Sequence, residues 1–180
     1  KEIKLLEDNT ALKARINELG LRPKEFFKVD IGPVVLDGWM IKPINFDPQK
    51  KYPIIFHVYG EPAGSTVQDN WNTGDNMWHQ YLANELGVLV VSIDNRGTKV
   101  PRGREFRKCI YRQIGLLAAD DQAAAAKKMM TMFPFIDSAH VGMWGWSGGG
   151  QMTLHGLFRH GNVFKTGIAV SFVALQTLYD

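Results

Sequence analysis

The chain has 180 residues, of which 45% are hydrophobic and 22% are charged. This is the usage of an ordinary globular domain, and it argues against a disordered chain or a fibrous repeat. The formal net charge of +3 is too small for a dedicated nucleic-acid-binding protein. The single cysteine, Cys109, excludes an intramolecular disulfide framework and a multi-cysteine zinc site. We therefore expect one folded domain that binds no nucleic acid.

The amino-terminal part of the sequence predicts a short helix and a hairpin. Asn9 or Thr10 can cap a helix that ends before Gly20. Two strands, Phe26–Ile31 and Leu36–Lys42, follow and are joined through Gly32 and Pro33. Their mixed polarity favours an antiparallel edge of a sheet over its centre.

The rest of the chain alternates apolar runs with helix-length segments. The expected strands are Pro53–Tyr59, Val88–Asp94, His140–Trp144 and Thr166–Ser171. The expected helices are Asn76–Leu86, Leu117–Phe133 and Gly149–Arg159. This spacing is typical of crossover units, and it predicts an α/β fold with a mostly parallel sheet and helices on both faces.

A long uncharged stretch, Ser138–Phe158, could be mistaken for a membrane span. Its 21 residues lack Asp, Glu, Lys and Arg, but they include six glycines and two histidines. Those residues make insertion into a bilayer costly, so we expect buried protein interior and no membrane span. The chain also begins without an initiator methionine, and we expect it to be the interior of a longer protein.

The strongest chemical signal is Gly145-Trp146-Ser147-Gly148-Gly149, which matches G-x-S-x-G. An apolar strand runs into this motif and a helix-compatible stretch follows it, as a nucleophile elbow requires. Glycines on either side of the serine relieve crowding between the strand and the helix. The amide of Gly148 would point where an oxyanion forms. The alternative is a glycine-rich turn that only permits close packing. A phosphate-binding loop is excluded because neither glycine pattern for one is present.

Several further segments resemble one family in order and spacing. They are Leu6-Glu7-Asp8-Asn9, Lys51-Tyr52-Pro53, His57-Val58-Tyr59-Gly60, Asp94-Asn95-Arg96-Gly97, Asp121-Gln122, Gly145-Trp146-Ser147 and Phe164–Val170. The chain is similar over nearly its whole length to the hydrolase domain of dipeptidyl peptidase IV-like enzymes of the prolyl oligopeptidase family. The resemblance implies an α/β-hydrolase fold up to the strand after the elbow, with a β-propeller upstream. It also implies release of N-terminal dipeptides whose second residue is proline or alanine.

The resemblance implies roles for individual residues. Ser147 matches the nucleophile, and Tyr59 matches a tyrosine whose hydroxyl joins the Gly148 amide in the oxyanion hole. Val173 and Tyr179 match residues that line a small apolar pocket for proline. For Tyr59 the alternative is a packed aromatic at the end of a strand, and for Val173 and Tyr179 it is ordinary packing.

Three positions depart from the family pattern. The family commonly has tyrosine where this chain has Gly148, so we expect a wider pocket there. Gln176 replaces a typical tryptophan, and Leu178 replaces an aromatic residue. These departures keep open another hydrolase activity, such as that of an esterase or an acylaminoacyl peptidase. A third alternative is a catalytically dead binding module, against which the intact Ser147 and Tyr59 argue.

The chain lacks a recognisable acid and base for the serine. In this fold they follow the nucleophile, but the only later histidines are His155 and His160, in or just after the elbow helix. We expect the triad to be completed outside these residues, and the isolated chain to be nearly inactive.

His57 is expected to be a satisfied interior histidine, and no spacing indicates a metal or cofactor site. Asp120 and Asp121 fit a helix amino-terminal turn, and Arg96 fits structural hydrogen bonding. The resemblance points to a peptide substrate, a location outside the cytoplasm and a parent protein that forms a homodimer.

Overall fold

The computed structural model describes residues 4–62, 64–70 and 74–175, and it contains one mixed sheet. The sheet has six strands in the order β1-β2-β4-β3-β5-β6. Their bounds are β1 Glu25–Asp30, β2 Val35–Ile41, β3 Tyr52–His57, β4 Leu89–Asp94, β5 Ile136–Trp146 and β6 Thr166–Val170. The last four pair in parallel, whereas β1 and β2 are antiparallel to each other and β2 is antiparallel to β4. The prediction of a mostly parallel sheet is confirmed.

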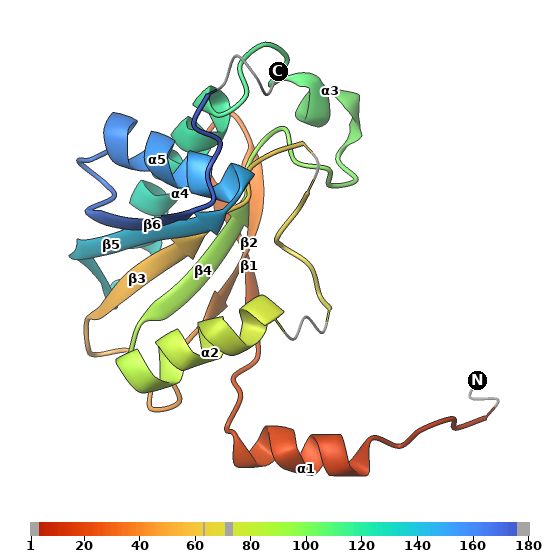
Figure 1. Cartoon of the computed structure of the whole chain (residues 1–180). Helices are drawn as coiled ribbons and strands as arrows, with labels where there is room; N and C mark the ends of the chain where they lie inside the picture. Colours follow the sequence, from red (N-terminus) through yellow and green to blue (C-terminus); the bar gives the residue numbers. More distant parts are fainter. Residues whose placement is uncertain (1–3, 63, 71–73, 176–180) are drawn as a thin grey trace.

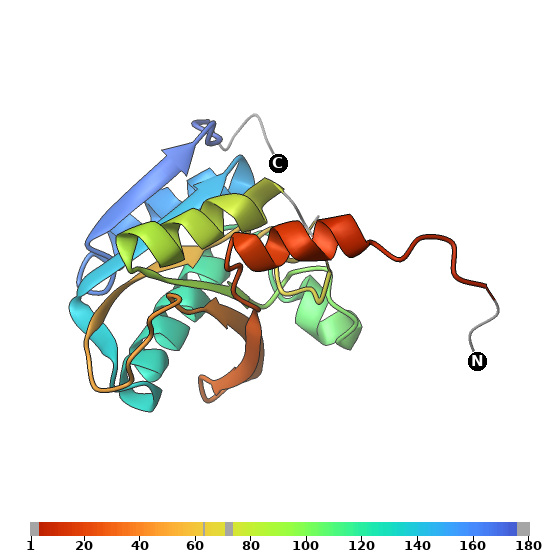
Figure 2. The same cartoon turned by 90° about the horizontal axis from the view of Figure 1, so that it is seen from below.

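Helices cover both faces of the sheet, as the sequence predicts (Figures 1 and 2). The helices are α1 Thr10–Glu18, α2 Gly74–Leu86, α3 Gly103–Lys108, α4 Leu116–Met132 and α5 Gly148–Arg159. α2 lies on one face and covers a small cluster that includes Trp39 and Val90. α4 and α5 lie on the other face, over the larger core.

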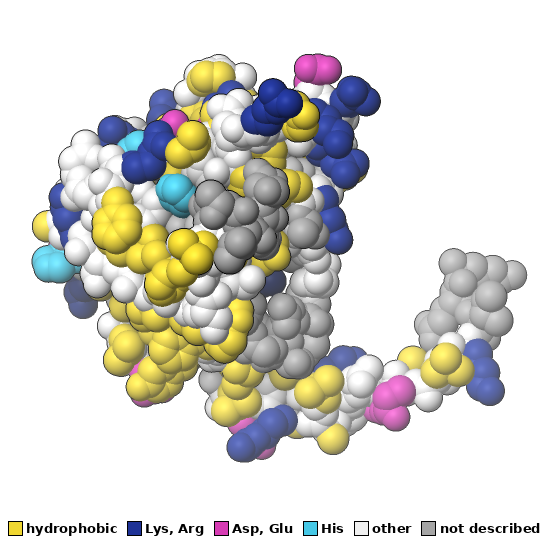
Figure 3. Space-filling model, turned by 45° about the horizontal axis from the view of Figure 1, so that its top comes forward, with side chains coloured by type: hydrophobic (Ala, Val, Ile, Leu, Met, Phe, Trp, Pro, Cys, Tyr) yellow, Lys and Arg dark blue, Asp and Glu magenta, His cyan; other side chains and the backbone are white. Residues whose placement is uncertain are grey.

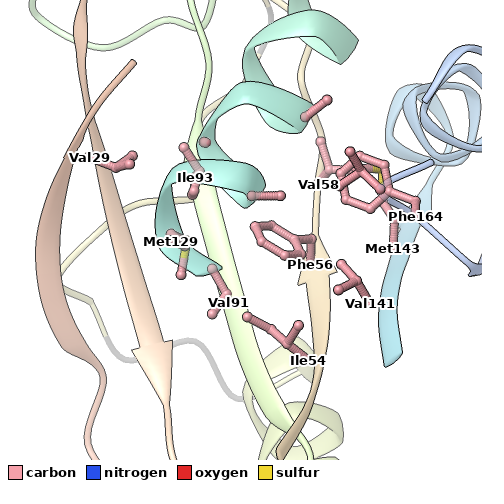
Figure 4. Close-up of a cluster of buried hydrophobic side chains, with 14 of the residues drawn as sticks. Val29, Ile54, Phe56, Val58, Val91, Ile93, Met129, Val141, Met143 and Phe164 are labelled. Carbon is pink, nitrogen blue, oxygen red and sulfur yellow. The ribbon is translucent and has the colours of Figure 1, made fainter. Parts of the chain in front are cut away.

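The larger core explains why the central strands read as apolar runs. Alternate residues of β3, namely Ile54 and Phe56, point into this core together with Val91 and Ile93 of β4 (Figure 4). α4 contributes Met129 and a row of small alanines, which let the helix lie close to the sheet. Because both faces of the central strands are covered, neither face needs polar side chains.

The hairpin differs in one respect from the expectation. β1 lies at the sheet edge, but β2 pairs on both sides, with β1 and with β4. Leu36, Trp39 and Met40 of β2 are therefore buried. The charged residue of this run, Asp37, forms an ion pair with Lys28 of β1 across the two strands at 3.1 Å.

The first helix also differs in detail. α1 projects away from the sheet and buries none of its residues (Figure 1). Asn9 does not cap it through its side chain, because its own backbone is in the left-handed region at φ 55°. Asp8 instead accepts a hydrogen bond from the Thr10 amide at 2.9 Å. The hydroxyl or amide cap expected from sequence is thus replaced by a carboxylate one residue earlier.

Candidate active site at the carboxyl edge of the sheet

The candidate residues meet at one edge of the sheet. Tyr59 lies two residues beyond the end of β3, and Asn95 comes directly after β4. Ser147 follows β5, and Ser171 follows β6. Because these four strands are parallel, their carboxyl ends share an edge, which is where open α/β sheets place their ligand sites. Residues far apart in the sequence are brought together here by topology alone.

Ser147 occupies a strained turn between β5 and α5. It is the only residue between the two elements, and its backbone has φ 56° and ψ −119°. A non-glycine residue in such a region typically stores about 1–3 kcal/mol. The turn is held because the Ser147 amide donates to the Val170 carbonyl at 2.9 Å and the Gln151 amide donates to the Ser147 carbonyl at 3.1 Å. The strand–turn–helix setting predicted for the motif is therefore present.

Crowding around the turn accounts for two of the motif glycines. A Cβ placed on Gly145 would lie 2.4 Å from the Gly149 carbonyl carbon and 2.5 Å from the Val58 carbonyl oxygen. A Cβ on Gly149 would lie 2.1 Å from the same Val58 oxygen. All of these atoms belong to backbone, which cannot move aside as a flexible side chain can. The expectation that these glycines let strand, turn and helix approach one another is confirmed.

Tyr59 stands on a loop that is tied to the neighbouring strand. Gly60, at φ 80°, turns the chain, and its carbonyl accepts a hydrogen bond from the Asn95 side chain at 3.1 Å. Gln122 of α4 in turn donates to Asn95 Oδ1 at 3.2 Å. The half-buried Tyr59 ring packs against Gly64, where a Cβ would lie 2.8 Å from the ring. The loop thus fixes both the backbone and the ring of Tyr59.

Glu61 lies between Tyr59 and Gly148, and sequence reasoning missed it. Its side chain is only 2% exposed, and a Cβ on Gly148 would lie 2.1 Å from its Oε1. The space expected to widen a pocket beside Gly148 is occupied by this carboxyl group. Burial, followed by the negative charge of Glu61 and a side-chain hydrogen bond to it, raises the pKa of the Tyr59 phenol. The unusual glycine at 148 was the one available signal of a compensating side chain.

Of the two expected pocket residues the structure describes Val173, whose role in a pocket stays a prediction. Val173 is half-buried and lies past the end of β6. Tyr179 lies outside the described residues, as do Gln176 and Leu178, so their placement stays a prediction.

Both histidines that follow Ser147 face other partners. His155 lies on α5 near Gln151, with 3.4 Å between Nε2 atoms, and burial lowers its pKa. His160 closes the helix and contacts Asp120 through its Nε2 at 2.8 Å. At about 1.5 Å per residue, the helix carries His160 about 18 Å from its first turn. Among the described residues, neither histidine makes a hydrogen bond with Ser147.

Asp121 is not a helix-dipole residue, contrary to the sequence interpretation. Its carboxylate is 1% exposed and accepts hydrogen bonds from the Arg96 amide at 2.9 Å and from Arg96 Nη2 at 2.6 Å. The structural role expected for Arg96 is confirmed, because this ion pair ties the end of β4 to α4. Asp120 instead faces Arg159 and His160 at the end of α5.

An aromatic cluster lies under α2 and includes two histidines. His57 stacks on Trp144 with 4.7 Å between ring centroids, and His79 lies 4.8 Å from His57. Burial, aided by the nearby His57 and Lys24, lowers the pKa of His79 to about 2. In the described part of the chain no group of three His, Cys, Asp or Glu residues could hold a metal ion. Within the same residues no helix is long and apolar enough to cross a membrane.

A basic surface lies beside the loop that carries Glu61. A cavity of about 400 Å³ there is lined by basic and apolar residues together: Pro62, Arg107, Lys108, Ile110, Tyr111, Arg112 and Ile114. Figure 3 shows Lys and Arg side chains gathered over α3, at the upper right. In α3 the basic residues are exposed and Phe106 is buried, as in a solvated helix face.

Comparisons with known proteins agree with this geometry. A model of the prolyl oligopeptidase family matches residues 74–180. Bovine prolyl endopeptidase FAP is 35% identical over 179 residues, or 99% of this chain and 23% of that protein. Dipeptidyl peptidase 4 of Trichophyton equinum is 36% identical, over 100% of this chain and 23% of that protein. The chain spans about a quarter of the length of these relatives.

A solved structure extends the likeness to three dimensions. The crystal structure of Porphyromonas gingivalis dipeptidyl peptidase 4 matches with a TM-score of 0.87 at 42% identity. The match covers 97% of this chain and 24% of that one. The sheet and its helices are therefore part of an α/β-hydrolase domain, and the chain belongs to the prolyl oligopeptidase family of serine peptidases.

Proposed function

We propose that the protein releases N-terminal dipeptides, with proline or alanine second, through an acyl-enzyme on Ser147. The single observation that carries this proposal is the strained elbow at φ 56°, which sets Ser147 at the sheet edge beside the Tyr59 loop. Relatives named dipeptidyl peptidase 4 support the substrate class. The strain is a feature that packing alone does not need, because glycine would occupy the turn at no cost.

The chemistry is an acyl transfer in two steps. Ser147 Oγ attacks the scissile carbonyl, its proton passes to a base, and the carbonyl oxygen becomes an oxyanion. The Gly148 amide and the Tyr59 hydroxyl donate hydrogen bonds to that oxyanion. Collapse breaks the C–N bond, and the leaving amine takes the proton from the base. Water then hydrolyses the ester, which returns the proton to Ser147 and frees the dipeptide.

The base and its acid belong to a part of the protein outside these 180 residues. His155 and His160 are the only histidines after Ser147, and both have other partners. Without a base, only about 10³–10⁴-fold catalysis over water is expected to remain. We therefore propose that the isolated chain is close to inactive. A β-propeller upstream would supply the residues that measure off a dipeptide.

An endopeptidase is the second candidate, and the FAP relatives favour it. Three reporters separate the candidates in the full-length protein: Gly-Pro-p-nitroanilide with a free amino group, its N-acetylated form, and p-nitrophenyl acetate. Dipeptide release predicts turnover of the first alone, abolished by Ser147→Ala. Equal turnover of the free and acetylated forms would replace the proposal with an endopeptidase, and turnover of the ester alone would replace it with an esterase.

A further inference from the structure

Glu61 is a buried acidic residue next to the candidate oxyanion hole. It is 2% exposed, and a carboxylate in such a place is costly unless it is hydrogen-bonded. Its backbone is held, because the Gly64 amide donates to the Glu61 carbonyl at 3.3 Å. The preceding residue, Gly60, is tied to Asn95. The position of this carboxyl group is therefore set by the fold.

The Glu61 carboxyl group contacts both halves of the candidate oxyanion hole. On one side its Oε1 fills the space beside Gly148, where a Cβ would lie only 2.1 Å away. On the other side it lies close enough to the Tyr59 hydroxyl that, after burial, its charge and side-chain hydrogen bonding raise the pKa of the phenol. The phenol has one O–H, so it donates and the carboxylate accepts. Glu61 thus lies between the Tyr59 hydroxyl, on the loop after β3, and the peptide that follows Ser147.

We propose that Glu61 is the positioning residue of the oxyanion hole, holding the Tyr59 hydroxyl beside the Ser147–Gly148 peptide, and that residue 148 is glycine to make room for it. The inference rests on the proposed function. When the oxyanion forms, the O–H turns from Glu61 to the oxyanion by rotating about its C–O bond, while the ring stays against Gly64. Glu61 touches no reacting atom and acts through Tyr59.

The test is a double-mutant cycle in the full-length protein, read as kcat and KM for Gly-Pro-p-nitroanilide. Glu61→Met removes the acceptor at similar volume, and we expect kcat to fall about tenfold, which is less than the roughly 10²–10³-fold loss typical of removing a whole donor. KM should stay within about twofold, because the interaction serves the transition state. Glu61→Gln keeps an acceptor oxygen and should lose less. Glu85→Met, on an exposed residue of α2, is the matched control and should change neither constant.

The decisive comparison is made in a Tyr59→Phe background. There Glu61→Met should have no further effect on kcat, because the hydroxyl that it positions is already gone. Gly148→Ala, which displaces the carboxyl group without altering either side chain, should lower kcat and should likewise have no further effect in that background. Because Glu61→Met and Gly148→Ala disturb the same contact in different ways, the same result from both cannot come from misfolding of one variant.

The opposing outcomes are distinct. If Tyr59→Phe lowers kcat and Glu61→Met lowers it again by the same factor, the positioning role is wrong while the proposed function stands. A rise in kcat for Glu61→Met would show that the carboxylate competes for the hydroxyl, which also overturns the inference. If Ser147→Ala retains turnover, the proposed function itself fails.

Discussion

Gly145→Ala tests the packing of the elbow most severely. The added Cβ would lie 2.4 and 2.5 Å from the carbonyl carbon and oxygen of Gly149 and 2.5 Å from the Val58 oxygen, where ordinary contacts begin at about 3.4 Å. Three backbone atoms would have to shift by about 1 Å. Overpacking of this kind costs about 1–3 kcal/mol, and we expect the upper end because no side chain can rotate away. At roughly 2–4 °C per kcal/mol, the midpoint of thermal unfolding should fall by about 6–12 °C.

The control for this prediction lies on the same strand. A Cβ on Gly142 would come closest to a side-chain atom, Thr166 Cγ2 at 3.1 Å, and its nearest backbone neighbour, the Thr166 carbonyl oxygen, would lie at an ordinary 3.6 Å. Gly142→Ala should therefore change stability by less than about 1 kcal/mol, part of which is the lower entropy of the unfolded chain. Differential scanning calorimetry of the two variants gives the comparison. Equal melting temperatures would refute the claim that backbone crowding fixes the glycine at 145.

Three further predictions concern strain, a buried ion pair and a buried histidine. Ser147→Gly should be about 1 kcal/mol more stable than Ser147→Ala in urea unfolding, because only glycine relieves φ 56°; equal stabilities would mean that the turn stores no strain. Arg96→Ala should cost about 3 kcal/mol by leaving the Asp121 carboxylate buried without its partner, and a loss below about 1 kcal/mol would contradict this account. Burial lowers the pKa of His79 to about 2, so the folded state resists protonation of this side chain. His79 therefore costs no stability above about pH 6.5, and below that pH the free energy of unfolding falls by about 1.4 kcal/mol per pH unit. In His79→Phe the loss of unfolding free energy on going to pH 5 should be smaller by about 2 kcal/mol. An unchanged slope of unfolding free energy against pH would show that His79 is not responsible.

The sequence was informative where local pattern and tertiary structure agree. The apolar runs of β3 and β4 are buried on both faces, and the glycine spacing around Ser147 reports a real steric limit. β5 is longer than the sequence predicts. Its first half, around Ser138 and His140, is exposed and polar and lies at an irregularity in the pairing with β3, so it lacks the apolar pattern of a buried strand.

Contacts between distant residues could not be read from the sequence. Glu61 and Gly148 are 148 − 61 = 87 positions apart in the sequence, and only the parallel order of β3 and β5 brings them together. Likewise, Asp121 looks like an ordinary acidic residue near a helix start until the fold places Arg96 against it. Burial of charged groups depends on partners that no local pattern encodes.

The central claim is that Ser147 is an activated nucleophile. The most direct measurement is to treat the full-length protein with a Pro-derived diphenyl phosphonate, which reacts with activated serines, and to map the adduct by mass spectrometry. We expect one adduct on Ser147, none in Ser147→Ala, and none on the isolated 180-residue chain. No adduct on the full-length protein, or an adduct on another serine, would contradict it.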